Sequence, residues 1–225
     1  MSMYICGDTH GMYDIDKLRH RYFDSSGLTK NDYVLICGDF GGVWDCGKHD
    51  KLIQEWFGNK PWTTLWVDGN HENHEALDTY PTAIWKGGEV HRISPSIIHL
   101  KRGQVYNIDG HKLFTMGGAT SVDKALRKEG ESWWSREMPS DYEYEEAVYN
   151  LKDNGNKVDF IVTHCASSSV TKCICSSFET DRLTDFLQRL EGEVSFKHWY
   201  FGHYHIDRKI DDKHTALYDR VVKLW

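Results

Sequence analysis

The sequence predicts an α/β protein in which two β-sheets pack together and helices cover the outside. Short apolar runs alternate with amphipathic segments over residues 1–67, which is the order of a parallel sheet with right-handed crossovers. Over residues 89–116 the pattern changes to closely spaced strand-like runs. No segment rich in Pro, Gly or Ser divides the chain, so we expect one domain spanning residues 1–225.

The individual elements follow from this pattern. Apolar runs predict strands at 4–6, 33–37, 63–67, 90–93, 97–100, 105–108, 113–116, 160–163 and 199–201, with further strand-like runs in the tail. Helical spacing of apolar side chains predicts helices at 12–23, 51–57, 141–151 and 181–190. Residues 117–139 are expected to form a long loop, and a loop of that length in a compact domain is often functional.

Composition narrows the classes of function. The formal net charge of -7 repels a polyphosphate chain, so extended nucleic-acid binding is not expected. Bound divalent metals would reverse the sign locally, which leaves a small or medium anionic substrate. The chain has neither an apolar run of about 20 residues nor the build of a signal peptide, so we expect a cytoplasmic protein without a membrane partner. No feature indicates an oligomeric state.

The six cysteines agree with that compartment. Cys6 and Cys37 lie in apolar runs and are expected to be small buried side chains rather than ligands. Cys173 and Cys175 form a lone Cys-x-Cys, which is not the paired Cys-x-x-Cys of a metal knuckle, so we interpret them as reduced thiols.

Oxygen donors follow the first three predicted strands. The tetrapeptide Ile-Cys-Gly-Asp ends at Asp8 and again at Asp39, and Asn70 follows Asp39 after the same interval. Each interval suits one strand-turn-helix unit, so these side chains are expected at the carboxyl ends of neighbouring strands. His10, two residues after Asp8, can reach the same metal ion. A carboxylate such as that of Asp39 can bridge two cations.

Asn70 begins the segment Gly-Asn-His-Glu at 69–72. Its side chain offers a neutral carbonyl ligand, and His71 is placed to face a substrate. The alternative is that Asn70 caps a helix with Glu72 and Glu75 in its first turn. Both interpretations can hold together.

Histidines follow two later strands. His164 ends the apolar run at 160–163, and the segment Gly-His-Tyr-His at 202–205 places His203 and His205 on one side of an extended segment. A histidine beside Gly at a strand end is poorly suited to core packing. Six other histidines do not follow an apolar strand in this way and are expected to be surface or hydrogen-bonded residues: His49, His91, His99, His111, His198 and His214.

Each motif is weak alone, but their order resembles that of the calcineurin-like metallophosphoesterase family from Gly7 to His205. The run at 117–124 is also similar to a bacterial and phage-type subset of small members. The resemblance implies a four-layer αββα fold with a dinuclear metal site at the carboxyl ends of strands. It implies that Asp8, His10 and His205 hold one metal, that Asn70, His164 and His203 hold the other, and that Asp39 bridges them.

Such a shell of oxygen and imidazole donors suits Mn, Fe, Co, Ni or Zn better than Mg or Ca, and manganese is the ion we expect. The resemblance implies hydrolysis of a phosphomonoester or phosphodiester by a metal-bridging hydroxide. His71 would protonate the leaving oxygen.

The sequence departs from the protein phosphatases of this family. An Asp and an Arg that they carry soon after the bridging Asp are replaced by Gly42 and Val43, although Asp45 lies near. We therefore do not expect a protein phosphatase. Two other functions stay open: a nuclease of the same fold, which the net charge disfavours, and a non-enzymatic metal-binding scaffold, in which ligands would usually be lost.

The loop at 117–139 is the predicted source of substrate contacts. Arg127 and Arg136 could each grip a phosphate oxygen with a planar guanidinium group, and Trp133 and Trp134 could stack on a base or a sugar. The alternative is structural: the Trp residues would pin the loop to the body, and the Arg residues would pair with Glu129, Glu131 or Glu137.

Overall fold

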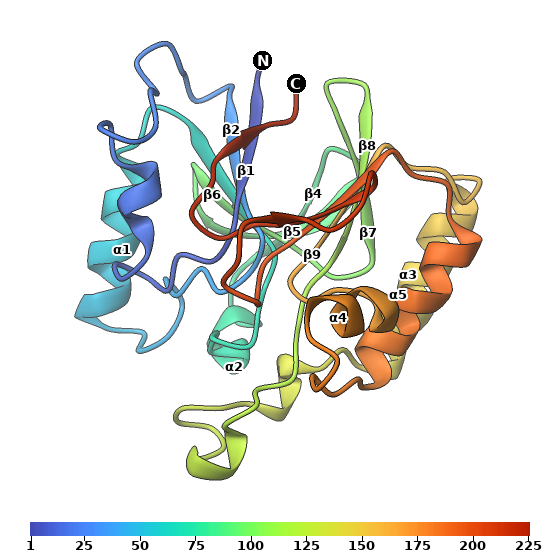
Figure 1. Cartoon of the computed structure of the whole chain (residues 1–225). Coiled ribbons are helices and arrows are strands. Elements are labelled where there is room, and N and C mark those ends of the chain that lie inside the picture. Colours follow the sequence, from blue (N-terminus) through green and yellow to red (C-terminus); the bar gives the residue numbers. More distant parts are fainter.

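Two β-sheets make up the centre of the computed structural model, which describes residues 1–225 (Figure 1). The seven-stranded sheet contains, in spatial order, β13 (Val222–Lys223), β1 (Met3–Cys6), β2 (Tyr33–Ile36), β3 (Thr63–Trp66), β6 (Ile97–Leu100), β5 (Gly88–Ser94) and β4 (Thr82–Trp85). The six-stranded sheet contains β11 (Arg208–Lys209), β12 (His214–Ala216), β10 (His198–Phe201), β9 (Phe160–Thr163), β8 (His111–Met116) and β7 (Gln104–Ile108).

Helices flank the two sheets on opposite sides. The α-helices are α1 (Lys48–Gly58), α2 (His74–Leu77), α3 (Asp141–Asp153), α4 (Ser168–Ile174) and α5 (Arg182–Glu193), and the 3-10 turns are η1 (Ile15–Leu18), η2 (Lys124–Leu126) and η3 (Ser135–Glu137). Helix α1 lies on one flank of the molecule, and α3, α4 and α5 lie on the other (Figure 1). No helix combines the length and the apolar character that crossing a membrane requires.

Three apolar clusters fill the spaces between the layers. The first joins the seven-stranded sheet to α1 and includes Val34, Ile36, Ile53 and Phe57. The second lies between the sheets and includes Ile5, Leu35, Leu113 and Val162. The third joins the six-stranded sheet to α3 and α5 and includes Phe114, Ile161, Leu151 and Leu187. Three interfaces require four layers, so the predicted αββα arrangement is confirmed.

Parallel pairing explains where the strands end. Strands β1, β2 and β3 are parallel, with Tyr4 opposite Val34 and Val34 opposite Thr64. Strands β8, β9 and β10 are also parallel. Every residue of β2 and β3 is buried, as expected for strands that are covered on both faces of the sheet. The carboxyl ends of each parallel set therefore lie along one edge of their sheet.

The helix predicted at 12–23 is wrong, because only the single turn η1 forms there. Lys17 lies inside this segment, and its side chain is buried. Its ammonium group donates to the backbone oxygen of Asp8 at 2.6 Å and to that of Tyr218. These contacts with the loop after β1 and with the C-terminal tail fix the segment as a turn, and Arg19 ends it in an extended conformation.

The proposed cap at Asn70 is also wrong, because Asn73 caps α2 by accepting from the backbone N–H of Ala76 at 2.9 Å. The helix of that alternative does form as α2, with Glu75 in its first turn, but it begins later than Asn70. Strand β4 and helix α4 were not predicted. The segment at 117–139 contains η2 and η3 and projects from the body between β8 and α3 (Figure 1, yellow-green).

Candidate metal centre

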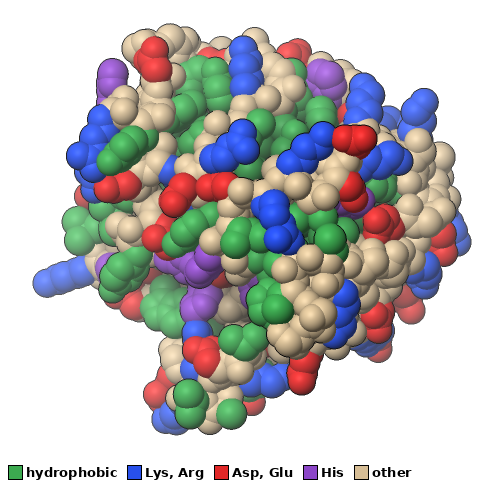
Figure 2. All heavy atoms as spheres, viewed as in Figure 1, with side chains coloured by type: hydrophobic (Ala, Val, Ile, Leu, Met, Phe, Trp, Pro, Cys, Tyr) green, Lys and Arg blue, Asp and Glu red, His purple; other side chains and the backbone are tan.

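Five strand ends, from both sheets, bring the predicted ligands together. Strands β1, β2 and β3 lead to Asp8, Asp39 and Asn70, while β9 and β10 lead to His164 and His203. Histidine side chains gather on this face, immediately above the projecting segment (Figure 2).

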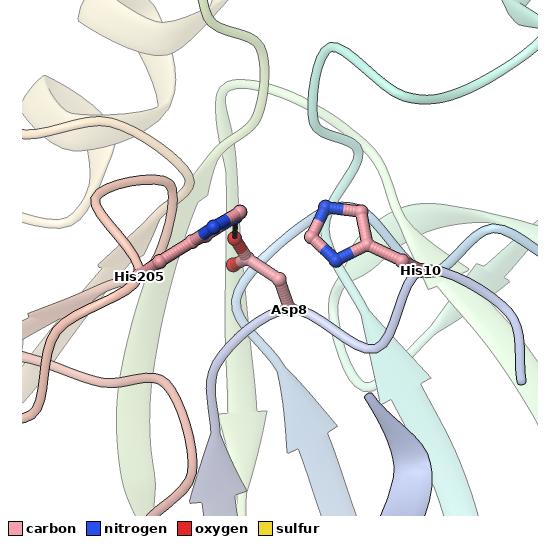
Figure 3. Close-up of side chains that lie close together, drawn as sticks. All are labelled: Asp8, His10 and His205. Carbon is pink, nitrogen blue, oxygen red and sulfur yellow. Dashed lines mark ion pairs between the residues drawn. The ribbon is translucent and has the colours of Figure 1, made fainter. Parts of the chain in front are cut away.

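Asp8, His10 and His205 form the first group of donors. Their ligand atoms all lie within 4.8 Å of one another. The Nε2 atom of His205 is 3.2 Å from a carboxylate oxygen of Asp8, and the rings of His10 and His205 have centroids 5.0 Å apart (Figure 3). Asp14 accepts a hydrogen bond from Nδ1 of His10 at 2.7 Å, which leaves Nε2 of His10 as the nitrogen directed to the centre.

Asp39 lies between the two groups of donors. Its Oδ2 atom is 3.3 Å from Nε2 of His10 and 3.3 Å from Nε2 of His164. Its Oδ1 atom accepts the backbone N–H of His71 at 2.8 Å. One carboxylate oxygen is thus equally close to an imidazole from each side.

Asn70, His164 and His203 form the second group. The Oδ1 atom of Asn70 is 3.1 Å from Nε2 of His164, and the rings of His164 and His203 have centroids 4.9 Å apart. The other ring nitrogen of His164 bonds to the backbone oxygen of Cys37 at 2.8 Å. Donors bound at about 2.1 Å to one ion lie about 3.0–3.4 Å apart, so these separations match those of ligands around a shared cation.

The backbone is strained at four candidate ligands. His10, Asp39, His203 and His205 have positive φ angles of 43°, 46°, 67° and 49°. Left-handed conformations of residues other than Gly carry a cost and are concentrated at functional sites. A Cβ atom on Gly69 would lie 2.0 Å from Oδ1 of Asp39, so only Gly permits this approach.

Electrostatics also favour a cation at the centre. Burial alone raises the pKa of Asp39, but the neighbouring His164 and His10 hold that pKa well below its usual range. Burial lowers the pKa of His164, yet Asp39 and Asp8 outweigh it and raise this pKa to about 9. Burial lowers the pKa of His203 to about 4, so its ring stays neutral. Without metal, the proton on His164 offsets part of the charge of the two buried carboxylates. A divalent transition metal bound by the deprotonated ring would supply that positive charge instead, which fits this donor set.

His71 lies at the edge of this centre. Its ring is 5.3 Å from that of His10 and stacks on Trp44 at 6.4 Å, between centroids. The two terminal nitrogens of Arg127 each lie 3.4 Å from a ring nitrogen of His71. Burial is the largest effect on the pKa of His71, and with Arg127 it outweighs Asp39, so the pKa lies below the ordinary value. Asp45 makes no hydrogen bond to this ring and instead accepts the N–H of Gly47 at 2.7 Å.

The projecting loop places one of its four predicted contact residues beside the centre. Arg127 reaches His71, and Asp123 pairs with its Nε atom at 2.8 Å. Arg136 instead forms ion pairs with Glu143 at 3.0 Å and Asp78 at 3.3 Å. These acids differ from the partners that the sequence suggested.

The two Trp residues of the loop differ in exposure. Trp134 is 3% exposed and packs edge-on against Trp44, with centroids 5.2 Å apart. Trp133 is half-buried, and Lys124 lies over its ring at 6.0 Å from the centroid. Burial of Trp134 agrees with the structural alternative, in which it pins the loop to the body.

Two supporting residues were not predicted as part of the site. The side-chain amide of Asn70 donates to the hydroxyl of Ser121 at 3.2 Å. That hydroxyl donates to Glu137 at 2.6 Å, and the backbone N–H of Ser121 donates to the other oxygen of Glu137 at 2.9 Å. The similarity of the run at 117–124 to a subset of the family was the available signal for Ser121. No comparable signal marks Glu137.

A groove of about 650 Å³ adjoins the centre at His203 and His205. Its walls are the first part of the projecting loop and the segment between α4 and α5. Phe178 and Asp181 come from that second segment.

Comparisons with known proteins agree with this arrangement. The family model described as calcineurin-like phosphoesterase matches residues 1–207. A curated relative, the lariat debranching enzyme of Schizosaccharomyces pombe, is 27% identical over 152 residues, which cover 60% of this chain and 31% of the relative.

Solved structures that partly match this chain include a putative 5'-nucleotidase from Staphylococcus aureus and a phosphopantetheinyl hydrolase from Mycobacterium tuberculosis. The first has a TM-score of 0.47 and 13% identity, and the match covers 96% of this chain and 48% of that one. The second has a TM-score of 0.43 and 13% identity, with 96% and 87% covered. The chain thus spans less than half the length of the curated relative and of the Staphylococcus aureus protein.

Proposed function

Because the chain belongs to the calcineurin-like phosphoesterase family, we propose that it is a metal-dependent hydrolase of small or medium phosphate esters. In this proposal residues 1–225 act as one catalytic domain. The observation that carries it is the position of Asp39, whose Oδ2 atom lies 3.3 Å from Nε2 of both His10 and His164. A carboxylate shared in this way is suited to holding two cations together.

The proposed centre holds two divalent ions. Asp8, His10 and His205 would bind one, Asn70, His164 and His203 the other, and Asp39 both. This shell of three oxygen-donor residues and four imidazoles supports Mn, Fe, Co, Ni or Zn, and we propose Mn. Two such ions supply positive charge for the phosphoryl oxygens and a water-derived nucleophile at neutral pH.

His71 and Arg127 are the proposed groups of the chain that act on the substrate itself. The backbone N–H of His71 is bonded to Asp39, which fixes the position of its ring relative to the centre. From there His71 gives a proton to the leaving oxygen. Arg127, 3.4 Å from the same ring, is placed to bind a phosphoryl oxygen. Its positive charge helps to lower the pKa of His71, which makes the protonated ring a stronger acid.

The other proposed contacts have weaker support. Arg136 is held by two acids, and Trp134 is buried against Trp44, so the structural alternative describes them better. Trp133 is kept as a proposed contact. A non-enzymatic scaffold is disfavoured because all seven candidate ligands and His71 are present. The net charge of -7 disfavours a nuclease with an extended binding surface.

A cytoplasmic location is part of the proposal. All six cysteines are free, which suits a reducing compartment. Cys6, Cys37 and Cys165 are buried, and burial raises the pKa of the Cys6 thiol to about 12, as expected of an inert side chain.

A hydrolysis screen tests the proposed function. The purified protein, loaded with Mn²⁺, is assayed on p-nitrophenyl phosphate and bis-(p-nitrophenyl) phosphate, and its metal content is measured. We expect hydrolysis of at least one ester, and we expect Asp39→Asn to lower metal content and turnover together. Normal turnover and two bound metals in Asp39→Asn would rule out the proposed bridge. Absence of hydrolysis by the metal-loaded parent would favour the scaffold.

A further inference from the structure

The proposed general acid lies on one side of the centre. His71, Arg127 and Trp44 border it next to His10, and none of the three lines the groove. A general acid must lie within hydrogen-bonding reach of the oxygen it protonates, so the departing alcohol leaves on the His71 side. The only ester arm of a phosphomonoester would therefore occupy that side.

The groove opens on the other side of the centre. It begins at His203 and His205, which line it, and extends to Phe178. Its volume of about 650 Å³ lies within the usual range of small-molecule pockets. A monoester bound for proton transfer from His71 leaves this space unused, whereas a phosphodiester has a second arm that can enter it.

The charges near the centre suit a diester. A monoester has three free phosphoryl oxygens and up to two negative charges, whereas a diester has two free oxygens and one charge. Arg127 is the arginine that contacts His71, and Asp123 partly neutralises it at 2.8 Å. Arg136 is held by Glu143 and Asp78. The chain therefore supplies little positive charge for a third free oxygen.

The groove also indicates the chemistry of the second arm. Phe178 is 41% exposed, and its ring stacks on Tyr204 with centroids 5.9 Å apart and planes 17° apart. Hydrogen bonds hold Tyr204 in place, one with Thr171 at 2.7 Å and one from the N–H of Ala166 at 3.2 Å. A fixed aromatic ring with an exposed surface favours a flat partner such as a nucleobase.

The charged groups of the groove exclude a further phosphate. Of the residues that line the groove, one, Lys124, is a Lys or Arg. Two acidic residues, Glu179 and Asp181, line it as well and oppose this charge. The carboxylate of Asp181 also accepts from the hydroxyl of Thr120 and from the N–H of Thr184. An arm with extra negative charge would be repelled, so the arm that fits is uncharged.

Resting on the proposed function, we propose that the substrate is a phosphodiester whose retained arm is a nucleoside lying in this groove. The P–O bond to the arm beside His71 breaks, and the departing oxygen takes a proton from His71. One water supplies hydroxyl to phosphorus, and its remaining proton replaces the one that His71 gave. The products are a nucleoside monophosphate and an alcohol.

Three esters with the same leaving group test this assignment: p-nitrophenyl phosphate, methyl p-nitrophenyl phosphate and thymidine 5′-(p-nitrophenyl) phosphate. For the Mn²⁺-loaded protein we expect kcat/KM to be highest for the thymidine ester. Loss of stacking on one base costs about 1–3 kcal/mol, so Phe178→Ala should lower kcat/KM for the thymidine ester roughly tenfold more than for the methyl ester. Phe178→Leu keeps the apolar contact with Tyr204 but not the flat ring. It should therefore lower kcat/KM for the thymidine ester, relative to the methyl ester, by about the same factor as Phe178→Ala. Tyr149→Ala removes an aromatic ring that is 69% exposed and lies outside the groove, and it should not change the ratio.

The outcomes separate the two proposals. Faster hydrolysis of the monoester than of both diesters overturns the diester assignment but leaves phosphoesterase activity intact. If both Phe178 variants lower kcat/KM equally for all three esters, Phe178 has a structural role and the proposed stacking on a nucleobase is wrong. If neither variant lowers kcat/KM for the thymidine ester, the groove does not hold the retained arm. Hydrolysis of none of the esters refutes the proposed function itself.

Discussion

Removing the hydroxyl of Ser121 should weaken one metal site without touching a metal ligand. In the native chain this hydroxyl accepts from the amide nitrogen of Asn70 at 3.2 Å and donates to Glu137 at 2.6 Å. Because the carboxylate takes the hydroxyl proton, the hydroxyl can only accept from Asn70. That constraint turns Oδ1 of Asn70 toward His164 and the centre.

The size of the effect follows from burial. Asn70, Ser121 and Glu137 are 5%, 2% and 1% exposed, so water cannot readily replace the lost partner. A buried polar group left without its hydrogen bond costs about 1–3 kcal/mol. Part of that cost falls on the orientation of Asn70, and loss of such a supporting contact typically lowers metal affinity by about 10–100-fold. We expect Ser121→Ala to weaken one of two Mn²⁺ sites by that factor.

Titration calorimetry of chelator-treated protein with Mn²⁺ measures this directly. Ser132→Ala, in the same loop, removes a half-buried hydroxyl that accepts from the backbone N–H of Lys128, and it should leave both affinities unchanged. A melting curve without metal detects any general loss of stability. If Ser121→Ala binds two Mn²⁺ ions as tightly as the parent does, Ser121 does not orient Asn70 and the argument fails.

Three further perturbations test other parts of the account. His71→Ala should keep both metals and lower turnover by roughly 10²–10⁴, with a smaller loss for esters of acidic alcohols, and loss of a metal would identify His71 as a ligand. Arg127→Ala should weaken turnover without changing metal content or Tm, whereas a Tm several degrees lower would indicate a structural role. Burial raises the pKa of Glu143, but Arg102 and Ser140 outweigh it and the pKa lies below its usual value. Ionised Glu143 therefore stabilises the fold above about pH 4.3, and this contribution is lost as the pH falls through the lowered pKa. Glu143→Gln should lower the Tm of the metal-free protein by about 2–8 °C at pH 7 and by less at pH 3.5, and a difference that does not depend on pH would contradict this sign.

The sequence predicted the layers and the convergence of the candidate ligands because both depend on short-range patterns. A buried strand reads as an apolar run, and the residue after it lies at the edge of the sheet, so Asp8, Asp39 and Asn70 could be placed without coordinates. The helix at 12–23 was mispredicted because its outcome depends on Lys17 bonding to a residue 201 positions away. Periodicity carries no information about such a contact.

Contacts made by the projecting loop were equally inaccessible. Arg127 and Arg136 look alike in the sequence, yet one lies 3.4 Å from His71 and the other pairs with Glu143. The difference arises from how η2 and η3 place each side chain relative to the body. The role of Ser121 depends on Glu137, sixteen positions away, and on Asn70 in another strand-end loop.

Stoichiometric activation by metal tests the central claim most directly. Chelator-treated protein, at a concentration well above the dissociation constants, is titrated with Mn²⁺ while hydrolysis of a p-nitrophenyl ester is followed. A centre in which Asp39 joins two ions predicts no activity without metal and a rise that reaches its plateau at two equivalents per chain. A plateau at one equivalent, or full activity in the chelated protein, would contradict the dinuclear account.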